Sequence, residues 1–388
     1  MTRSELCPLC GSQTDSVLQL SFNVKLNLPT KPEIRHCAAD NFLFVANGSQ
    51  PDYDEYYKSL ANDTVHGEVA GGNLRSPISM LQMSHLIPAL GDFFSKPRKV
   101  LDFGCGEACL LVELAGEFPS SSFIGFDPGP AAQIGSGKAT KLHLQNLQIA
   151  DLKTSIDHGP FDFVIASHVV EHLLDFGLLG LLNDLLTEGG LLYIEVPNSL
   201  QYEARRRQEF LYYFDRLHVN HFTPRSLARL AAAHGFGSLS HFEYAFPYRD
   251  GGEYPALGML FQKGRSVVEI TSPSILDAAE RYIGQEKLRA QTVSAEFNDY
   301  ENVLVWGAGD NFFRSTENGG PLSDLRNMIV LDRRPQEITV GDRKYLTENP
   351  QVSIRRHPWP VVITVSEGRK SISEQVSQID PTRRVFFV

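Results

Sequence analysis

The chain has 388 residues, of which 42% are hydrophobic and 21% charged, and this balance predicts two or three folded domains rather than a disordered or fibrous chain. The net charge of −10 argues against a large basic surface, so we expect no nucleic-acid partner. No apolar run reaches the roughly 18 residues of a membrane span, and the first residues lack the apolar stretch of a signal peptide. We therefore expect no membrane partner and a cytoplasmic location, while the oligomeric state stays open.

The first fifty residues, 1–50, stand apart and predict a small zinc-binding module. Cys7 and Cys10 form a Cys-x-x-Cys knuckle, and Cys37 follows after a proline-interrupted loop. A tetrahedral zinc site takes four ligands, and the fourth is either Asp40, which completes a second knuckle spacing, or His36. A metal-free hairpin that keeps these side chains is the alternative. The chain has five cysteines, and this odd number favours metal or packing roles over disulfides.

Residues 51–95 are polar and aromatic, then weakly helical, and we interpret them as a helical lid or linker. In residues 96–265, short apolar runs that end in small or acidic residues alternate with helical stretches, which is typical of a parallel α/β sheet. The predicted strands are 99–104, 123–127, 147–151, 161–167 and 190–198. Two further runs, 239–246 and 256–263, flank a turn-rich segment and predict an antiparallel hairpin that completes the sheet.

The pattern restarts after residue 264 and predicts a second, smaller α/β domain over residues 266–388. A helix over 275–297 precedes ENVLVWGAGDN, and the later predicted elements are strands at 328–332 and 361–365, a helix at 369–379 and a final strand RRVFFV. The Gly-rich turn within 303–311 is either a nucleotide or sugar-nucleotide site, with Asp332 ending the next strand, or a tight structural turn.

The turn after the first strand of the central domain has the features of a nucleotide site. Gly104, Cys105 and Gly106 lie between a buried strand and an apolar helix, so the backbone can turn tightly and bring a ligand to the free N–H groups of the helix. Asp127 ends the second strand, where a carboxylate can accept both hydroxyls of a ribose. Asp151 ends the third strand, in position for an exocyclic adenine amine. The pattern therefore predicts a cofactor that contains adenosine.

This order of motifs resembles the class I S-adenosylmethionine-dependent methyltransferases over residues 99–198. VLDFGCGEA is similar to their glycine motif, with Ala108 in place of the usual last glycine, and FDPG, IADL, FDFVIASHVVEH and GGLLYIEVPN follow in the family's order. The resemblance implies a Rossmann-like core with a seven-stranded sheet, and S-adenosyl-L-methionine as cofactor. The cofactor-binding residues that it implies are Asp102, Gly104, Cys105, Gly106, Asp127, Pro128, Asp151, Leu152, Ser167 and His168.

The domain order also resembles the sugar C-methyltransferases, which methylate a nucleotide-linked 4-keto-deoxysugar at C-3. In that family a zinc module and a C-terminal Rossmann-like domain flank the sugar nucleotide, and a His and a Tyr act in proton transfer. LHVNHFTPRSL matches the histidine stretch at His218, and YDEYY offers Tyr56 or Tyr57 as the tyrosine. Asp40 replaces a cysteine of the family pattern, Leu217 replaces the glutamate before the histidine, and GAGDNFFR lacks the lysine-bearing helix start.

Methylation of a carbon next to a ketone needs a base that removes one proton and a donor that stabilises the enolate. The candidates are His218, His172, His221, Glu171 and Tyr57. We expect the histidines and Glu171 near the carboxyl ends of the fourth and fifth strands, where open α/β sheets bind ligands. The sequence thus predicts C-methylation of a nucleotide-linked deoxysugar or a related small metabolite. Oxygen or nitrogen methylation of a sugar, polysaccharide precursor or natural product, and a non-catalytic nucleotide-binding scaffold, are the alternatives.

The stretch SHVVEH at residues 167–172 contains His-x-x-Glu-His, the signature of an inverted zinc-protease motif. Such a site needs both histidines on one face of one helix. The preceding run FDFVIAS predicts a strand, so we expect His168 at the strand's exit and His172 at the start of the next helix. The two side chains should then diverge, which disfavours a metallopeptidase.

Overall fold

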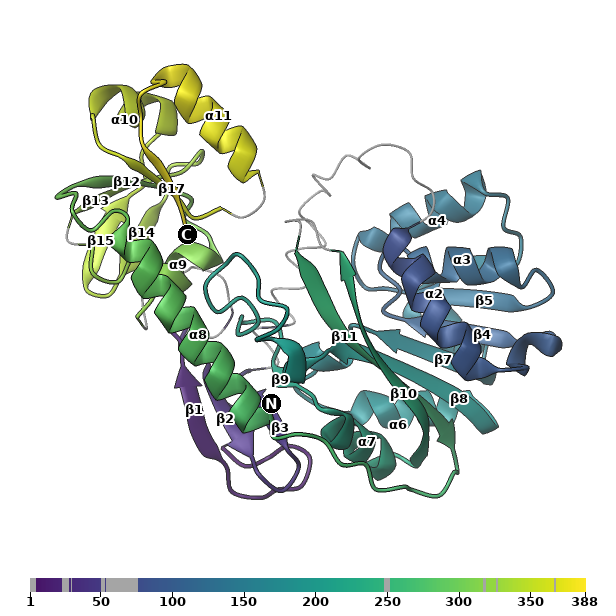
Figure 1. Cartoon of the computed structure of the whole chain (residues 1–388). Coiled ribbons are helices and arrows are strands. Elements are labelled where there is room, and N and C mark those ends of the chain that lie inside the picture. Colours follow the sequence, from purple (N-terminus) through teal and green to yellow (C-terminus); the bar gives the residue numbers. More distant parts are fainter. Residues whose placement is uncertain are drawn as a thin grey trace.

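The computed structural model describes residues 5–22, 28, 30–49, 53, 76–247, 252–316, 319–325, 327–365 and 368–388. Figure 1 shows a large central α/β domain, a small N-terminal sheet beside it, and a second α/β domain at the C-terminus. The long helix α8, Ile275–Ala295, runs from the N-terminal sheet to the C-terminal domain (Figure 1).

The central domain is built on a seven-stranded sheet in the order β10-β11-β8-β7-β4-β5-β6. Its strands are β4 (Lys99–Phe103), β5 (Ser122–Phe126), β6 (Leu147–Ile149), β7 (Phe161–Ser167), β8 (Leu186–Pro197), β10 (Phe236–Pro247) and β11 (Glu253–Lys263). The first five are parallel, and β11 pairs antiparallel with both β8 and β10. The predicted Rossmann-like core with a closing hairpin is confirmed.

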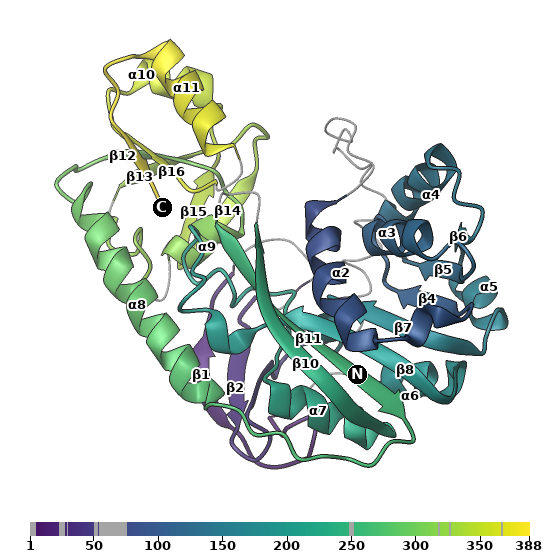
Figure 2. The ribbon, with the colours of Figure 1, turned by 45° about the vertical axis from the view of Figure 1, so that its right-hand side comes forward.

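Helices cover both faces of this sheet. Helices α2, α3 and α4 lie together on one side and α6 and α7 on the other (Figure 2). The helices of the domain are α2 (Pro77–Leu90), α3 (Cys109–Glu117), α4 (Ala131–Lys141), α5 (Leu152–Asp157), α6 (Gly177–Leu185) and α7 (Pro224–Ala233), with short 3-10 turns η1 (Phe93–Ser95), η2 (Val170–His172) and η3 (Ser199–Gln201). Successive residues of β8 alternate between the two cores, with Leu192 and Ile194 in one and Leu191 and Tyr193 in the other. A strand that is buried on both faces has a continuous apolar sequence, and β8 shows this over residues 191–194.

The N-terminal sheet is not a separate unit, because one of its four strands comes from the central region. Its strands are β1 (Asp15–Gln19), β2 (Glu33–Cys37), β3 (Phe42–Val45) and β9 (Asn220–His221), in that order. Asn41 accepts a hydrogen bond from the backbone of Ile275 at the start of α8 (2.8 Å), and Arg229 of α7 donates to the carbonyl of Ala39 (2.8 Å). The module predicted at residues 1–50 is therefore joined to both other parts of the chain.

The C-terminal domain has a parallel four-stranded sheet in the order β13-β12-β16-β17, with a two-stranded hairpin beside it. Its elements are β12 (Val303–Trp306), α9 (Asp310–Thr316), β13 (Met328–Leu331), β14 (Glu337–Val340), β15 (Arg343–Leu346), α10 (Pro350–Arg356), β16 (Val361–Ile363), α11 (Arg369–Ile379) and β17 (Val385–Phe387). This is the second, smaller α/β domain predicted from the sequence. Among the described residues, no helix combines the length and the apolar character that crossing a membrane requires.

Candidate active site and metal centre

The glycine turn after β4 brings the backbone close to the neighbouring loop. Gly104 has φ of +83°, and a Cβ added there would lie 2.5 Å from Val169 Cγ2, so only glycine fits. Ala108, buried and with φ of +55°, precedes α3 where the family has a glycine. Gly135 of α4 gives Ala108 its room, because a Cβ on Gly135 would lie 2.9 Å from that of Ala108. Cys105 lies within the same turn, and burial raises the pKa of its thiol far above the usual range.

Asp127 and Asp151 follow two neighbouring strands and so lie along one edge of the sheet. Asp127 accepts hydrogen bonds from the backbone N–H groups of Gly106 (2.9 Å) and Gly129 (2.7 Å), which ties the second strand's end, with Pro128, to the glycine turn. Asp151 caps α5 by accepting from Thr154 N (2.8 Å), and this bond lowers its pKa. The arrangement suits the predicted ribose and adenine contacts, although no described contact tests those roles for Asp127, Pro128, Asp151 or Leu152.

Asp102 lies in β4 beneath the glycine turn and is 3% exposed. Burial, followed by the charges of Asp127 and Glu195, raises its pKa to about 8. Asp102 Oδ1 has no hydrogen-bond partner in the described part of the chain. A buried carboxyl in this state would be stabilised as an anion by a cationic ligand.

Glu195 of β8 is the centre of a buried hydrogen-bond network. It accepts hydrogen bonds from four side chains on three strands and α2: Gln82 Nε2 (2.7 Å), Ser167 Oγ (3.2 Å), Tyr244 Oη (2.5 Å) and Tyr193 Oη. Burial alone would raise the pKa of Glu195, but His168 and the two tyrosines outweigh it and lower the pKa to about 2. Nothing in the sequence pattern marks Gln82 or the two tyrosines as partners of Glu195.

His168 lies at the exit of β7 with φ of +55°, as predicted. Its Nδ1 lies 3.0 Å from Glu171 Oε1 and its Nε2 lies 3.2 Å from Glu195 Oε1. Burial lowers the pKa of His168, but the two carboxylates outweigh it and raise the pKa to about 10. His168 is therefore an imidazolium at neutral pH and cannot act as a base. Because η2 begins after His168, the two histidines of SHVVEH do not share a helix, which contradicts the metallopeptidase alternative.

A second cluster brings together His172, His218 and Glu171. The imidazole rings lie 5.0 Å apart between centroids, and His172 Nε2 lies 3.8 Å from Glu171 Oε1. Each imidazole has an acceptor at Nδ1: the carbonyl of Leu217 for His172 (3.0 Å) and Asp215 Oδ2 for His218 (3.1 Å). Burial lowers the pKa of His172. At His218 burial acts in the same direction, but Asp215 outweighs it and raises the pKa.

The other predicted catalytic residues are His221, which lies outside this cluster, and Tyr57. His221 lies on β9 in the core, 1% exposed, with its Nδ1 3.1 Å from the Tyr202 hydroxyl. Burial, then the charge of His218, lowers its pKa to about 3, so it stays neutral and has no access to a substrate. Tyr57, like Tyr56, lies outside the described residues, and its role stays a prediction. Asp215 was missed in the sequence, although its position three residues before His218 is a usable signal.

The loop that carries Asp215 and His218 is fixed by the C-terminal domain. Arg216, fully buried, forms an ion pair with Asp310 (2.9 Å) of the Gly-rich turn. Asn311, next in that turn, accepts a hydrogen bond from the backbone N–H of Phe210 (3.2 Å). The turn at 303–311 therefore has a structural role toward the loop at 210–218, whichever ligand role it has besides.

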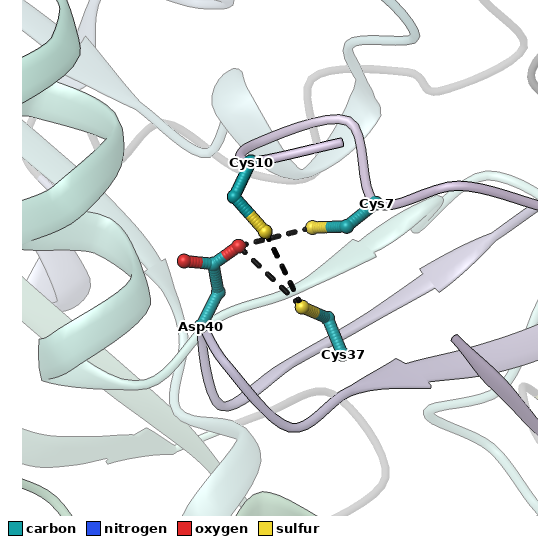
Figure 3. A group of neighbouring side chains, drawn as sticks. All are labelled: Cys7, Cys10, Cys37 and Asp40. Carbon is teal, nitrogen blue, oxygen red and sulfur yellow. Dashed lines mark hydrogen bonds between the residues drawn. The ribbon is translucent and has the colours of Figure 1, made fainter. Parts of the chain in front are cut away.

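The predicted metal ligands Cys7, Cys10, Cys37 and Asp40 point toward one another (Figure 3). One ligand atom from each lies within 4.8 Å of all the others. Asp40 Oδ2 lies 3.1 Å from Cys7 Sγ and 3.5 Å from Cys37 Sγ, while Cys10 Sγ and Cys37 Sγ are 3.7 Å apart. Burial raises the pKa of the Cys7 and Cys37 thiols, so without a cation they would be neutral. Three sulfurs and one carboxylate oxygen in this grouping fit a structural zinc ion.

The alternative fourth ligand, His36, is not part of this group. It precedes Cys37 on β2, so its side chain leaves the opposite face of the strand. The charges that act on it come from Asp15, Asp277 and Glu280, and burial lowers its pKa. Asp40 is held instead, by Arg229 at 3.0 Å from its Oδ1.

Comparison with known proteins assigns the central domain. Residues 79–241 match the family model of a methyltransferase domain. No curated protein matches the chain. Two solved structures that align with about half of it are an S-adenosylmethionine-dependent methyltransferase from Methanosarcina mazei (18% identity, 50% of this chain and 99% of the other, TM-score 0.37) and coclaurine N-methyltransferase (15% identity, 48% and 72%, TM-score 0.35). Residues 79–241 therefore have the sequence features of a methyltransferase domain, which supports the predicted use of S-adenosylmethionine.

Proposed function

We propose that the enzyme methylates a carbon next to a ketone in a nucleotide-linked deoxysugar or a related small metabolite, with His218 as the general base. The pairing of His218 with Asp215 carries this proposal. Because Asp215 accepts the Nδ1 proton of His218, the Nε2 lone pair is available to take a proton from the acceptor. Asp215 also stabilises the imidazolium that forms.

His172 supports the same reaction in a different way. Its Nδ1–H donates to the carbonyl of Leu217, so its Nε2 is an acceptor when the ring is neutral, and burial keeps it neutral by lowering its pKa. We infer that His172 accepts a hydrogen bond from a hydroxyl of the acceptor and so orients it. Tyr57 stays the proposed donor to the enolate.

The cofactor supplies an electrophilic methyl group on a sulfonium when it is bound. The described residues near His168 suit a cation. The His168 imidazolium lies between two carboxylates, Glu171 and Glu195, so one negative charge is left over. The fixed carboxylates leave a net negative charge beside the glycine turn, which favours binding of a positive ligand.

A buried cation, Arg216, lies next to the acid that pairs with the proposed base. The Arg216 guanidinium lies at the junction of the three parts of the chain, beside Asp310 and 5.0 Å from the ring of Phe22. Its Nε and Nη1 have no hydrogen-bond partner among the described residues, although the side chain is fully buried. Because this side chain has no exposed surface, we infer that it stabilises the junction and does not contact the acceptor.

Calorimetry with S-adenosylmethionine tests the cofactor, and isotope transfer tests the acceptor. Protein incubated with methyl-labelled cofactor and a panel of nucleotide-linked keto-deoxysugars should place the label on carbon. His218→Ala should keep cofactor affinity and lose about 10²–10⁴-fold in turnover, whereas His241→Ala, at an exposed position on β10, should match the wild type. Label on oxygen or nitrogen would support the alternative acceptors, and unchanged turnover in His218→Ala would remove the base.

We also infer that Cys7, Cys10, Cys37 and Asp40 bind one structural zinc ion. Metal analysis of the purified protein should give about one equivalent of zinc, and Cys37→Ser should reduce it. Asp40→Cys, which keeps four ligands, should retain the metal, whereas Asp40→Ala should bind it more weakly. Less than about half an equivalent in the wild type would contradict the site. Three free thiols at one place suit a reducing compartment, so a cytoplasmic location stays our prediction.

A further inference from the structure

The cluster of Glu171, His172 and His218 has the donor set of a metal site as well as that of an acid–base site. One ligand atom from each side chain lies within 4.8 Å of the other two. Both histidines use Nδ1 to meet an acceptor, Leu217 O and Asp215 Oδ2, and so leave Nε2 for another partner. Metal-binding histidines show this arrangement, in which a carbonyl or carboxylate at one ring nitrogen fixes the tautomer and orients the other nitrogen toward the ion.

Glu171 completes the donor set from the backbone turn η2. Its carboxylate is fully buried, and its Oε2 has no hydrogen-bond partner in the described chain. Its Oε1 lies 3.0 Å from His168 Nδ1, while His172 Nε2, at 3.8 Å, is beyond hydrogen-bond distance. The three side chains are therefore close together but do not hydrogen-bond to one another. A small cation would satisfy the remaining oxygen and nitrogen lone pairs.

The surrounding charges also favour a cation. Glu171 belongs to the cluster, Asp215 lies 3.1 Å from His218 Nδ1, and Glu195 lies 3.2 Å from His168 Nε2. The carboxylate within the cluster supplies negative charge that a divalent ion would balance. His172 and His218 remain partly accessible, with 27% and 17% of their side chains exposed, so an ion can reach them.

We propose that Glu171, His172 and His218 bind a divalent transition-metal ion, and that this ion competes with the acceptor and stops methyl transfer. Two imidazoles and one carboxylate suit zinc, cobalt or nickel better than magnesium or calcium, which prefer oxygen. The competition rests on the proposed role of His218, since a metal on Nε2 removes the lone pair that takes the proton. Metal binding itself does not depend on that role.

Cobalt(II) added to the zinc-loaded full-length protein, without cofactor, tests the site. We expect one additional equivalent to bind, with d–d absorption but without the sulfur-to-metal charge-transfer band that cobalt in the cysteine site would give. His172→Ala and Glu171→Gln should each lose this binding, and Asp215→Asn should weaken it about 10–100-fold by removing the acceptor at His218 Nδ1. His241→Ala is the matched control and should bind as the wild type does. The binding of cobalt with equal affinity by the wild type and His172→Ala, or no additional equivalent in the wild type, would overturn the proposal.

Circular dichroism and cofactor calorimetry on each variant separate a lost ligand from a lost fold. His172→Ala and His218→Ala replace partly exposed side chains, so these two keep the test valid if the buried Glu171→Gln does not fold. Inhibition by cobalt should be competitive with the acceptor and reversed by a chelator. An active enzyme that binds no second metal would sink this proposal alone, whereas a protein that binds cobalt but no S-adenosylmethionine would sink the proposed function alone.

Discussion

Replacing Asp102 with asparagine tests the electrostatics of the cofactor pocket most directly. Asp102 is 3% exposed, and burial followed by the charges of Asp127 and Glu195 raises its pKa from 3.8 to about 8. At pH 7 and without ligand, the carboxyl is therefore protonated. Asparagine has nearly the same shape and cannot ionise, so the variant removes the titration and changes little else.

The size of the effect follows from the pKa. Because the folded pKa lies above the unfolded one, the folded protein binds more protons between these values, and its stability falls as the pH rises from about 4 to about 8. With about 1.4 kcal/mol for each pH unit in that window, the stability lost by the wild type between pH 5.5 and pH 8.5 is about 3 kcal/mol. The free energy of unfolding of Asp102→Asn, relative to the wild type, should increase by that amount over the same interval.

Urea unfolding followed by circular dichroism at about pH 5.5 and pH 8.5 measures this difference. Asp184→Asn, at an exposed position on α6, is the control and should show almost no change in its stability relative to the wild type. A relative change below about 1 kcal/mol for Asp102→Asn would refute the assignment of a protonated carboxyl.

The same carboxyl should also couple to the cofactor. The positive charges of S-adenosylmethionine would favour the carboxylate, so binding near pH 7 should release up to about one proton. The binding enthalpy of the wild type should therefore depend on the ionisation enthalpy of the buffer, and that of Asp102→Asn should not. Asp102→Asn should also bind the cofactor about tenfold more weakly, which corresponds to about 1.4 kcal/mol. Equal buffer dependence in the two proteins would show that Asp102 is not the group that titrates.

Two further substitutions test the networks around the site. Glu195→Gln should lower the free energy of unfolding by about 3 kcal/mol, because it replaces a charged acceptor of four hydrogen bonds. Tyr193→Phe should lower it by about half as much. Equal losses in chemical unfolding would show that the charge of Glu195 does not add to stability. Asp310→Ala should cost about 3–5 kcal/mol because it leaves the fully buried Arg216 unpaired, and Arg216→Met should cost less because Asp310 is 40% exposed. The reverse order of these two losses would contradict the burial of Arg216.

The central sheet and the positions of the predicted cofactor residues at its edge could be predicted because their signals are local. Each parallel strand is a short apolar run followed by a small or acidic residue, and the alternation with helices fixes the layers. Gly104, Gly106 and Asp127 lie where strand-end geometry requires them, and Gly106 and Asp127 are joined by a hydrogen bond of 2.9 Å. The cluster of Cys7, Cys10, Cys37 and Asp40 was also predictable, because ligand spacing is a property of the sequence.

The features that could not be predicted depend on contacts between distant segments. Strand β9 has only two residues, which is too short for a periodic pattern, yet it joins residues 220–221 to the N-terminal sheet. Glu195 accepts a hydrogen bond from Gln82, on a helix 113 positions earlier, and another from Tyr244, on a strand 49 positions later. His221 was predicted to be catalytic because it is close to His218 in the sequence. Its strand pairs with Leu43, and this pairing places His221 in the core. The position of a histidine near a motif therefore does not show whether its side chain faces the site or the core.

The C-terminal domain gains a defined role from these distant contacts. Arg216 lies next to Asp215 and two residues before His218, and its ion pair with Asp310 fixes this loop from outside the methyltransferase domain. The backbone N–H groups of Leu217 and His218 donate to Asp215 (2.8 and 2.7 Å). Arg216 therefore lies in the same tight turn that orients the proposed base, His218. Any shift of the Gly-rich turn would therefore act on His218 through the backbone, without contact between that turn and the reacting atoms. The methyltransferase domain alone would hold the cofactor residues in place, but its loop at 210–218 would lack the partners that fix the proposed base.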